Sequence, residues 1–553
     1  MPPSAPALPR PRTPVVGSVR RSVARGSLDG LYDGVVAAPP GRAGARGGWR
    51  PTPTGAPAAR AASSAMAAAA IQPAHRLGVG PQQDSPPPAR MTPEVPREIV
   101  RPIVLAAGLG KRMRSTQPKV LHPVAGRPMI RHVLRTLAAL GLPRPVVVVG
   151  HGAEAVEAAV GEDGRCVLQP EPRGTGDAVR AALEQAAADL AEARAALVLY
   201  GDMPLLRAET LERLIAAHAE SGGLVMLTGH PADPTGYGRV LRDAAGQVTG
   251  VVEEADATPA ERAVREVNAG VYVVDLALLR EAVTALRPQN AQGEYYLTDM
   301  VGWAVRRGVR PRAVVAENPE ELLGVNSRRE LARVEAAFRA RLLDRLMDAG
   351  VTVIDPAHTY VHVDVTVGPD TVLHPGTSLE GTTRVGSGCV IGPQARLVDA
   401  EIGDRVTVVA STITRASVGE GSRVGPYAHL RPGTRVGRYV EIGNYAEMKN
   451  ATVGDYTKVH HHSYLGDATV GQRVNIGAGT VTCNLRDRSG QKWPTVIEDE
   501  AFIGSDTMLV APVRVGRGAS TGAGSVVTRD VPAGALAVGV PARVIRRGAE
   551  APR

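Results

Sequence analysis

A six-residue period in the aliphatic side chains limits the fold of this sequence more than any other feature. Between residues 351 and 545, Val, Leu, Ile or Met recurs at every sixth position in three runs. The runs are Val367, Leu373, Leu379, Val385, Ile391, Leu397; Val418, Val424, Leu430, Val436, Ile442, Met448; and Ile497, Ile503, Leu509, Val515. Gly follows several of these residues, as a tight corner requires. The pattern predicts a left-handed parallel β-helix of hexapeptide repeats over residues 351–545.

The composition agrees with such a fold and narrows the class of protein. Only 3% of the 553 residues are aromatic, so the cores must be packed with small aliphatic side chains. A chain of this length is too long for one core, so we expect two or more domains. The three Cys are far apart, which excludes a disulfide framework and fits a reducing compartment. No stretch approaches the roughly 18 apolar residues that span a bilayer, so we expect a cytoplasmic protein.

Residues 1–98 differ in composition from the remainder. They hold 18 of the 44 Pro and carry twelve Arg, no Lys and five acidic residues, which leaves the other residues almost neutral. We expect this segment to be disordered, because it cannot bury enough apolar surface. It could be an organellar transit peptide, but a start at Met91 is the favoured interpretation. The rest has no basic stripe interleaved with aromatic residues, which argues against a nucleic-acid partner.

Alternating strand and helix patterns are predicted over residues 99–327. Residues 103–106, 145–149 and 196–200 are short apolar runs separated by helical patterns. This alternation is typical of a doubly wound, Rossmann-like and mostly parallel sheet, which binds ligands at the carboxyl ends of its strands. The residues that follow these runs are therefore the candidates for a binding site.

One long helix is predicted between the two patterns. Leu331, Val334, Phe338, Leu342 and Leu346 recur at steps of three and four residues, which makes one apolar stripe. We expect a linker helix over residues 328–350 that ends at Gly350, and a short tail at residues 546–553.

Three motifs near the start of the predicted sheet carry a resemblance to a known family. They are LAAGLGKRM (residues 105–113), PKVL (118–121) and GRPMI (126–130). Glycines at 108 and 110 let backbone N–H groups approach a phosphate. The set resembles the sugar-1-phosphate nucleotidyltransferases. Within that group the chain is similar, over residues 100 to 545, to the bifunctional N-acetylglucosamine-1-phosphate uridylyltransferase/glucosamine-1-phosphate N-acetyltransferases.

The resemblance implies a uridylyltransferase site in the first half. Nucleotide contacts would come from Leu105, Ala106, Ala107, Gly108, Arg112, Lys119, Tyr200 and Gly201, with Arg112 and Lys119 as the catalytic cations. The uracil would be read by Gln169, Gly174 and Thr175. The sugar would be held by Gly238, Glu253 and Asn268. The ligands of Mg²⁺ would be Asp202 and Asn326.

The chemistry of uridylyl transfer explains these residue types. Two anions, a sugar phosphate and UTP, must be brought together, so cations and Mg²⁺ have to neutralise charge. One carboxylate and one amide suffice for Mg²⁺, which keeps several of its waters. Taken singly, Asp202 could cap a turn and Glu253 could be a solvated surface acid. Leu109 and Ala269 depart from the family pattern without removing a charged catalytic group.

In the second half, a further set of motifs resembles the acetyltransferase of the same family. Its motifs are RPG (431–433), EMK (447–449), HHSYLGD (461–467) and NIGAG (475–479). The resemblance implies that His461 is the general base, which suits a side chain whose ordinary pKa lies near neutrality, and that Glu447 orients it. The sugar phosphate and sugar would be bound by Arg431, Lys449, Tyr464, Asn475 and Asn484. The acetyl-CoA channel would be lined by Ser505 and Ala523.

Three features of this half leave alternatives open. His460, His461 and His462 suggest a metal site, but neighbouring side chains on a strand point to opposite faces. After Asn484 the chain reads Leu485-Arg486-Asp487 where the family usually has Tyr-Asp-Gly, in a loop about two residues longer. An Arg usual in the family is also absent at Gly539-Val540-Pro541.

We therefore predict a bifunctional enzyme that makes UDP-N-acetylglucosamine. Glucosamine-1-phosphate would be acetylated from acetyl-CoA, and N-acetylglucosamine-1-phosphate would then react with UTP and release pyrophosphate. The resemblance also implies a homotrimer. A uridylyltransferase whose β-helix only assembles the oligomer is the main alternative, and a non-catalytic regulatory subunit is the other.

Overall fold

In the computed structural model of this chain, residues 99–546 are described, and the predicted tails lie outside them except for residue 546. The N-terminal sheet has the order β11-β7-β10-β6-β1-β4-β5. Its strands are β1 (Val100–Leu105), β4 (Val146–Val149), β5 (Arg165–Leu168), β6 (Ala195–Tyr200), β7 (Leu224–Gly229), β10 (Val267–Asp275) and β11 (Arg312–Val315), with β8 (Arg239–Arg242) and β9 (Val248–Val252) as a side ribbon. The predicted fold class is confirmed, and β10 alone among the seven strands of that order runs antiparallel to both neighbours.

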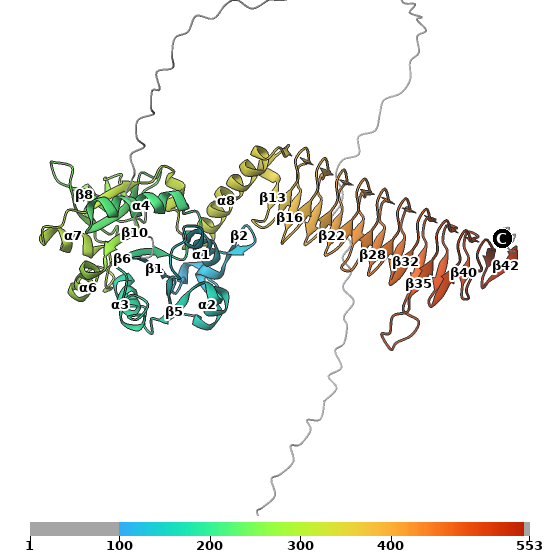
Figure 1. Cartoon of the computed structure of the whole chain (residues 1–553), viewed down its shortest axis with the longest axis horizontal. Coiled ribbons are helices and arrows are strands. Elements are labelled where there is room, and N and C mark those ends of the chain that lie inside the picture. Colours follow the sequence, from blue (N-terminus) through green and yellow to red (C-terminus); the bar gives the residue numbers. More distant parts are fainter. Residues whose placement is uncertain (1–98, 547–553) are drawn as a thin grey trace, which may run out of the picture. The chain divides into compact units, whose positions relative to one another are not determined.

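Helices cover both faces of the N-terminal sheet (Figure 1). One face carries α1 (Met129–Ala139), α2 (Ala153–Val160) and α4 (Ala208–Ser221), and the other carries α3 (Thr175–Gln185), α6 (Leu276–Ala285) and α7 (Asp299–Arg306). Strand side chains alternate between the faces: Val104 packs in the first core, and Ile103 and Leu105 pack in the second. Two apolar faces of one sheet are thus buried, as a doubly wound fold requires.

Helix α8 (Arg328–Asp348) is the predicted linker helix. Its first half contributes Val334 and Phe338 to a small core of the N-terminal domain. Its second half contributes Leu343, which the predicted stripe left out, to the core of the β-helix. The apolar face therefore shifts along the helix, because each half packs against a different core. Gly350, with φ of 91°, follows the last turn.

A buried histidine connects α8 to the N-terminal domain. His132 on α1 donates from Nε2 to the carbonyl oxygen of Val124 at 2.8 Å, and its ring lies 4.5 Å from that of Phe338. Val124 belongs to the hairpin of β2 (Pro123–Val124) and β3 (Arg127–Pro128). Burial lowers the pKa of His132 from 6.5 to about 4.

This lowered pKa predicts a loss of stability in mild acid. Between pH 6.5 and 4, His132 is protonated in the unfolded chain but stays neutral in the folded chain. The free energy of unfolding therefore falls as the pH falls. His132 should contribute a loss of about 2 kcal/mol between pH 7 and pH 5. Urea unfolding of the wild type and of His132→Leu at the two pH values measures this loss, and an equal pH dependence in both proteins would contradict it.

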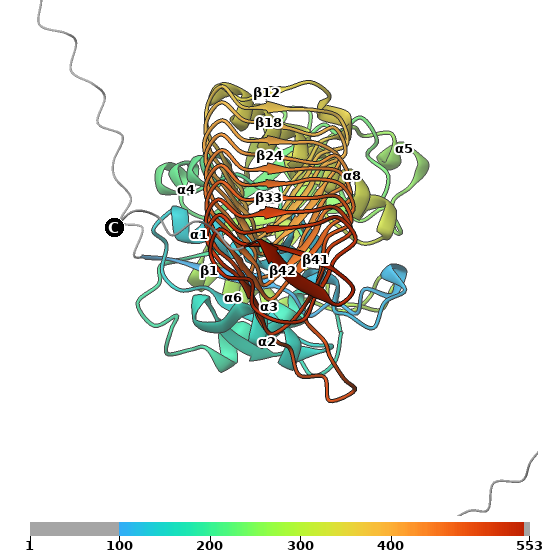
Figure 2. The same ribbon diagram turned by 90° about the vertical axis from the view of Figure 1, so that its right-hand side faces the viewer.

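The C-terminal part is a β-helix of three parallel sheets, and Figure 2 looks along its stacked coils. The first sheet holds β12 (Thr352–Val353), β15 (Val372–Leu373), β18 (Val390–Ile391), β21 (Thr407–Val408), β24 (Arg423–Val424), β27 (Glu441–Ile442), β30 (Lys458–Val459), β33 (Asn475–Ile476), β36 (Phe502–Ile503), β39 (Ser520–Thr521), β41 (Leu536–Gly539) and β42 (Ala542–Arg546), the last one antiparallel. The second holds β13 (Tyr360–Val361), β16 (Ser378–Glu380), β19 (Arg396–Val398), β22 (Thr412–Thr414), β25 (His429–Leu430), β28 (Glu447–Lys449), β31 (Tyr464–Gly466), β34 (Val481–Cys483), β37 (Met508–Val510) and β40 (Val526–Val527). The third holds β14 (Thr366–Val367), β17 (Arg384–Val385), β20 (Glu401–Ile402), β23 (Ser417–Val418), β26 (Arg435–Val436), β29 (Thr452–Val453), β32 (Ala468–Val470), β35 (Thr495–Ile497) and β38 (Val513–Val515).

The predicted inward positions are buried, apart from the half-buried Val367 in an early coil. Between the runs the structure adds Ile402, Val408 and Ile413 as inward residues. They escaped the sequence pattern because some steps there shorten from six residues to five. The left-handed β-helix is confirmed as the fold of this part, and no helix within residues 99–546 is long and apolar enough to cross a membrane.

Candidate functional site

The first candidate site lies where the strands β1, β4, β5 and β6 end. Leu105 and Tyr200 are register partners at the ends of β1 and β6, and the loop of Ala106, Ala107 and Gly108 follows. The amide of Gly201 donates to the carbonyl oxygen of Leu105 at 2.9 Å. A Cβ atom at Gly201 would lie 2.7 Å from the end of the Ile130 side chain, so a larger residue there would have to displace Ile130. The predicted nucleotide-binding segments thus lie side by side at the carboxyl edge of the sheet.

Lys119 brings the two predicted metal ligands together. Its ammonium group forms an ion pair with the Oδ2 atom of Asp202 and donates to the Oδ1 atom of Asn326 at 2.9 Å. Lys119 and Asp202 are largely buried, with side chains 13% and 12% exposed. One cation therefore already contacts both oxygen ligands. A carboxylate and an amide oxygen that share a cation fit a hard divalent ion such as Mg²⁺.

The local sequence explains where Asn326 lies. Ser327 caps α8 by accepting the amide of Glu330, and the Glu330 carboxylate accepts the amide of Asn326 at 2.8 Å. The amide of Val325 donates to the carbonyl oxygen of Asp202 at 3.1 Å. These bonds hold the segment before α8 against the turn after β6, although more than a hundred residues separate the two in the chain.

The loop before Lys119 carries a cationic side chain, Arg112, that is free to bind a ligand. Arg112 lies in the 3-10 helix η2 (Lys111–Met113), is exposed, and forms no hydrogen bond or ion pair with another residue of the described part. A Cβ atom at Gly108 would meet nothing within 4 Å. The space above this loop is open, and its unpaired charge can meet an anionic ligand.

Gln169, Gly174 and Thr175 form the next part of the site. Gln169 is 5% exposed and its amide group donates to the carbonyl oxygen of Gly174 at 3.2 Å. Thr175 begins α3, and its hydroxyl accepts the amide of Leu297 at 3.0 Å. Gly174 has φ of 108°, and a Cβ atom there would lie 2.7 Å from the carbonyl oxygen of Tyr295. The structure therefore places the three predicted uracil-reading residues together.

Gly238, Glu253 and Asn268 are also neighbours. The amide of Asn268 donates to the carbonyl oxygen of Gly238 at 2.9 Å, and a Cβ atom at Gly238 would lie 3.4 Å from a Glu253 oxygen. The hydroxyl of Thr298 donates to Glu253 at 2.9 Å. Burial raises the pKa of the Glu253 carboxyl, although this hydrogen bond opposes the rise. Glu253 is consequently a half-buried group and not a solvated surface acid.

The second candidate site lies on the β-helix. Residues 461, 505 and 523 occur in turns that lead from the first sheet to the second, on nearby coils. The amide of Gly479 donates to the carbonyl oxygen of His461 at 3.0 Å, and the amide of Gly524 donates to the carbonyl oxygen of Ser505 at 2.8 Å. Ala523 directly precedes Gly524. The same corner of the β-helix therefore carries His461, Ser505 and Ala523, as expected for a base and an acyl-donor channel.

The other predicted residues surround the second sheet. Glu447 and Tyr464 are register partners on β28 and β31, and Lys449 ends β28. Asn475 lies on β33 of the first sheet, next to the corner of His461. Arg431 and Asn484 follow β25 and β34 at the opposite corner.

The structure gives Glu447 a partner other than the predicted one. Arg431 donates to Glu447 Oε1 at 2.7 Å, whereas His461 Nδ1 lies 2.7 Å from the side-chain oxygen of Asn444. Sequence reasoning missed Asn444, which lies 17 residues before His461. That separation is one coil at this point, since Glu441 is in register with Lys458. The coil length could therefore have identified it.

The three consecutive histidines bind three different partners. His460 contacts Glu441 at 3.2 Å, His461 contacts Asn444, and the ring of His462 stacks on Tyr445 at 4.8 Å. His461 and His462 have φ of 52° and 53°, so they form a turn and not the strand that we expected. Within residues 99–546 no cluster of three or more His, Cys, Asp or Glu could hold a metal ion.

The altered loop leaves the β-helix between β34 and β35 (Figure 1). Leu485 and Lys492 form an antiparallel bridge, and the amide of Trp493 donates to the carbonyl oxygen of Asn484 at 2.9 Å. Asn484 itself is buried and donates to Asp467 Oδ2 at 2.6 Å. The altered loop is thus an exposed hairpin, and Asn484 stays anchored in the coil.

Comparison with known proteins agrees with the two domains. Residues 102–292 match the MobA-like NTP transferase domain, and residues 415–450 match the bacterial transferase hexapeptide repeat. The bifunctional protein GlmU of Heliobacterium modesticaldum is 49% identical over 437 residues, which is 79% of this chain and 94% of the relative. The bifunctional protein GlmU of Kineococcus radiotolerans is 49% identical over 452 residues, 81% of this chain and 90% of the relative.

The fold and the two sites define a nucleotidyltransferase joined to a hexapeptide-repeat acyltransferase. More particularly, the chain belongs to the family of the bifunctional GlmU proteins. The family and the pair of transferase activities predicted from the sequence are thereby confirmed.

Proposed function

We propose that this chain makes UDP-N-acetylglucosamine by two transfers at two separate sites. The observation that carries the first site is the contact of one Lys119 ammonium with both Asp202 and Asn326 at the carboxyl edge of the sheet. The substrates are glucosamine-1-phosphate and acetyl-CoA at the β-helix, and N-acetylglucosamine-1-phosphate and UTP at the sheet.

In the uridylyl transfer, the phosphate of the sugar attacks the α-phosphorus of UTP and pyrophosphate leaves. Arg112 and Lys119 bind the phosphates, and Gln169, Gly174 and Thr175 hold the uracil. Gly238, Glu253 and Asn268 orient the sugar, so the two anions meet in a fixed geometry. Asp202 and Asn326 would hold a Mg²⁺ ion, which would neutralise negative charge on the phosphates.

In the acetyl transfer, the amine of glucosamine-1-phosphate attacks the thioester carbonyl of acetyl-CoA, the C–S bond breaks, and CoA leaves as its thiol. With Asn444 Oδ1 as its acceptor, Nδ1 of His461 bears the ring hydrogen. Nε2 is then left to accept the proton that the attacking nitrogen loses. Arg431 and Lys449 bind the sugar phosphate, and Ser505 and Ala523 line the CoA channel. The Glu447 carboxylate acts through Arg431, its ion-pair partner.

The remaining predictions concern assembly and location. We propose a homotrimer in the cytoplasm. An exposed column of stacked rings, Tyr427, Tyr445 and His462, lies at the corner that carries His461 and supports a protein contact there. Light scattering on the purified chain tests the trimer, and a monomer would contradict it.

A coupled assay on the purified chain tests the function. Glucosamine-1-phosphate, acetyl-CoA, UTP and Mg²⁺ are supplied together, and CoA and pyrophosphate are followed separately. We expect both products, with pyrophosphate release dependent on the acetylated sugar. Pyrophosphate from added N-acetylglucosamine-1-phosphate without any CoA release from glucosamine-1-phosphate would instead show a uridylyltransferase whose β-helix only assembles the oligomer.

A further inference from the structure

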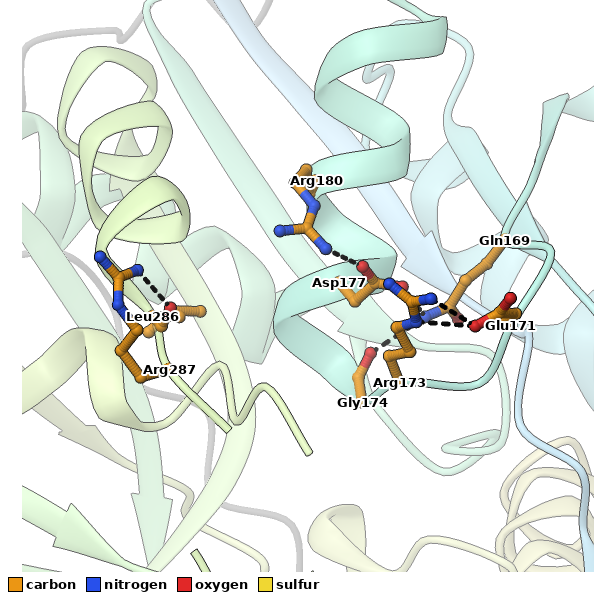
Figure 3. A network of polar contacts seen from close by, with 8 residues as sticks. All are labelled: Gln169, Glu171, Arg173, Gly174, Asp177, Arg180, Leu286 and Arg287. Atoms are coloured by element: carbon orange, nitrogen blue, oxygen red, sulfur yellow. Dashed lines mark hydrogen bonds and ion pairs between the residues drawn. The ribbon is translucent and has the colours of Figure 1, made fainter. Parts of the chain in front are cut away.

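The buried side chain of Gln169 has a fixed orientation (Figure 3). Its amide nitrogen donates to the carbonyl oxygen of Gly174 at 3.2 Å and to Asp177 Oδ2 at 2.8 Å. Both hydrogens of the amide group are therefore engaged. A carbonyl and a carboxylate accept hydrogen bonds and donate none, so the opposite orientation of the amide would lose both bonds.

Asp177 is itself held in place. It lies in the first turn of α3, where a carboxylate is favourable, and it forms an ion pair with Arg180 one turn later. The Arg180 guanidinium lies 5.1 Å from the centre of the Tyr295 ring. The carbonyl oxygen of Tyr295 accepts the amide of Gly176 at 2.8 Å. The helix, the ion pair and the segment of Tyr295 therefore fix the carboxylate that faces Gln169.

One atom of the Gln169 amide is left over. Its Oε1 atom has no hydrogen-bond partner within residues 99–546. Because Asp177 and Gly174 occupy both hydrogens of the amide nitrogen, a ligand can meet only Oε1. That atom accepts a hydrogen bond and cannot donate one. Uracil carries an N–H donor at N3, whereas cytosine carries a lone pair there. An acceptor fixed at this position attracts the first base and repels the second.

We propose that Asp177 is a positioning residue that sets the preference of this site for uracil over cytosine, by holding Gln169 with its oxygen toward the base. The inference rests on the proposed uridylyl transfer and adds a residue that does not itself touch the substrate. Arg180 supports Asp177 in this role. If the Asp177 carboxylate is removed, Gln169 can turn and present its amide nitrogen, which suits cytosine.

Steady-state kinetics with UTP and CTP on the full chain test the proposal. In Asp177→Asn, the ratio of kcat/KM for UTP to that for CTP should fall by roughly tenfold. The loss for UTP should lie in KM, with kcat almost unchanged. Asp177→Glu keeps a side chain that can only accept, whereas Asn can also donate, so Asp177→Glu should retain most of the preference. Arg180→Gln should lower the preference to a smaller extent than Asp177→Asn.

Glu184→Gln is the matched control, because Glu184 is an exposed acid on the same helix with no ion pair in the described residues. It should leave both nucleotides unaffected. The thermal midpoint and the CoA release of each variant report whether the chain has folded. An unchanged UTP/CTP ratio in Asp177→Asn, with activity retained, would overturn the positioning role. Absence of UTP-dependent pyrophosphate release from the wild type would instead refute the proposed function.

Discussion

Replacement of Asp202 by Ala is expected to lower UTP-dependent pyrophosphate release by about a hundredfold to a thousandfold. The change removes one of the two side-chain oxygens that contact the Lys119 ammonium, and it leaves that ammonium without its carboxylate partner. Negative charge on the transferring phosphate then lacks its counter-charge in the transition state. Pyrophosphate release from UTP and N-acetylglucosamine-1-phosphate measures the effect, with UTP and Mg²⁺ well above their apparent constants.

Two comparisons make the Asp202 result specific. CoA release from acetyl-CoA and glucosamine-1-phosphate by the same variant should match the wild type, because that reaction belongs to the β-helix. Asp344→Ala removes an exposed carboxylate of α8 that has no ion pair in the described part, and it should leave both activities unchanged. Loss of both activities in Asp202→Ala would refute two independent sites.

The sequence predicted the two architectures because each has a period that needs no knowledge of distant contacts. The six-residue steps of the β-helix place one aliphatic residue inward on each side of a coil. The alternation of apolar strands with helical patterns predicts the doubly wound sheet in the same local way. The pattern failed at Ile402, Val408 and Ile413, where some turns lose one residue. The inward position is set there by the register of the neighbouring coil and not by a fixed count.

The candidate site residues were predicted from motifs, but the hydrogen-bond and ion-pair partners that lie outside those motifs were not. Asp202 and Asn326 were proposed as a pair from the resemblance alone, and the structure adds Lys119 as the group that joins them. Asn444 and Asp177 were missed because their partners come from another coil or from another turn of the chain. No local spacing encodes such a contact. Only the coil length of 17 residues at His461 could have indicated the first of the two.

Replacement of His461 by Ala is expected to lower CoA release by about a hundredfold to ten-thousandfold, which is the usual contribution of a general base. Asn444→Ala should give a smaller loss, because His461 stays in place but neither ring nitrogen is then selected to carry the hydrogen. Assays with glucosamine-1-phosphate and acetyl-CoA measure both variants. Pyrophosphate release from N-acetylglucosamine-1-phosphate and UTP should be unaffected in each.

His462→Ala is the control that separates catalysis from folding. The two histidines are adjacent in one turn, with φ of 52° and 53°, so Ala costs the backbone a similar amount at either position. His462 stacks on Tyr445 and takes no part in the proposed proton transfer. If His462→Ala reduced CoA release as much as His461→Ala while light scattering showed an unchanged oligomer, the loss would come from the turn. His461→Asn tests the same point from the other side, since Asn tolerates this conformation but cannot take the proton, and activity retained in that variant would remove His461 as the base.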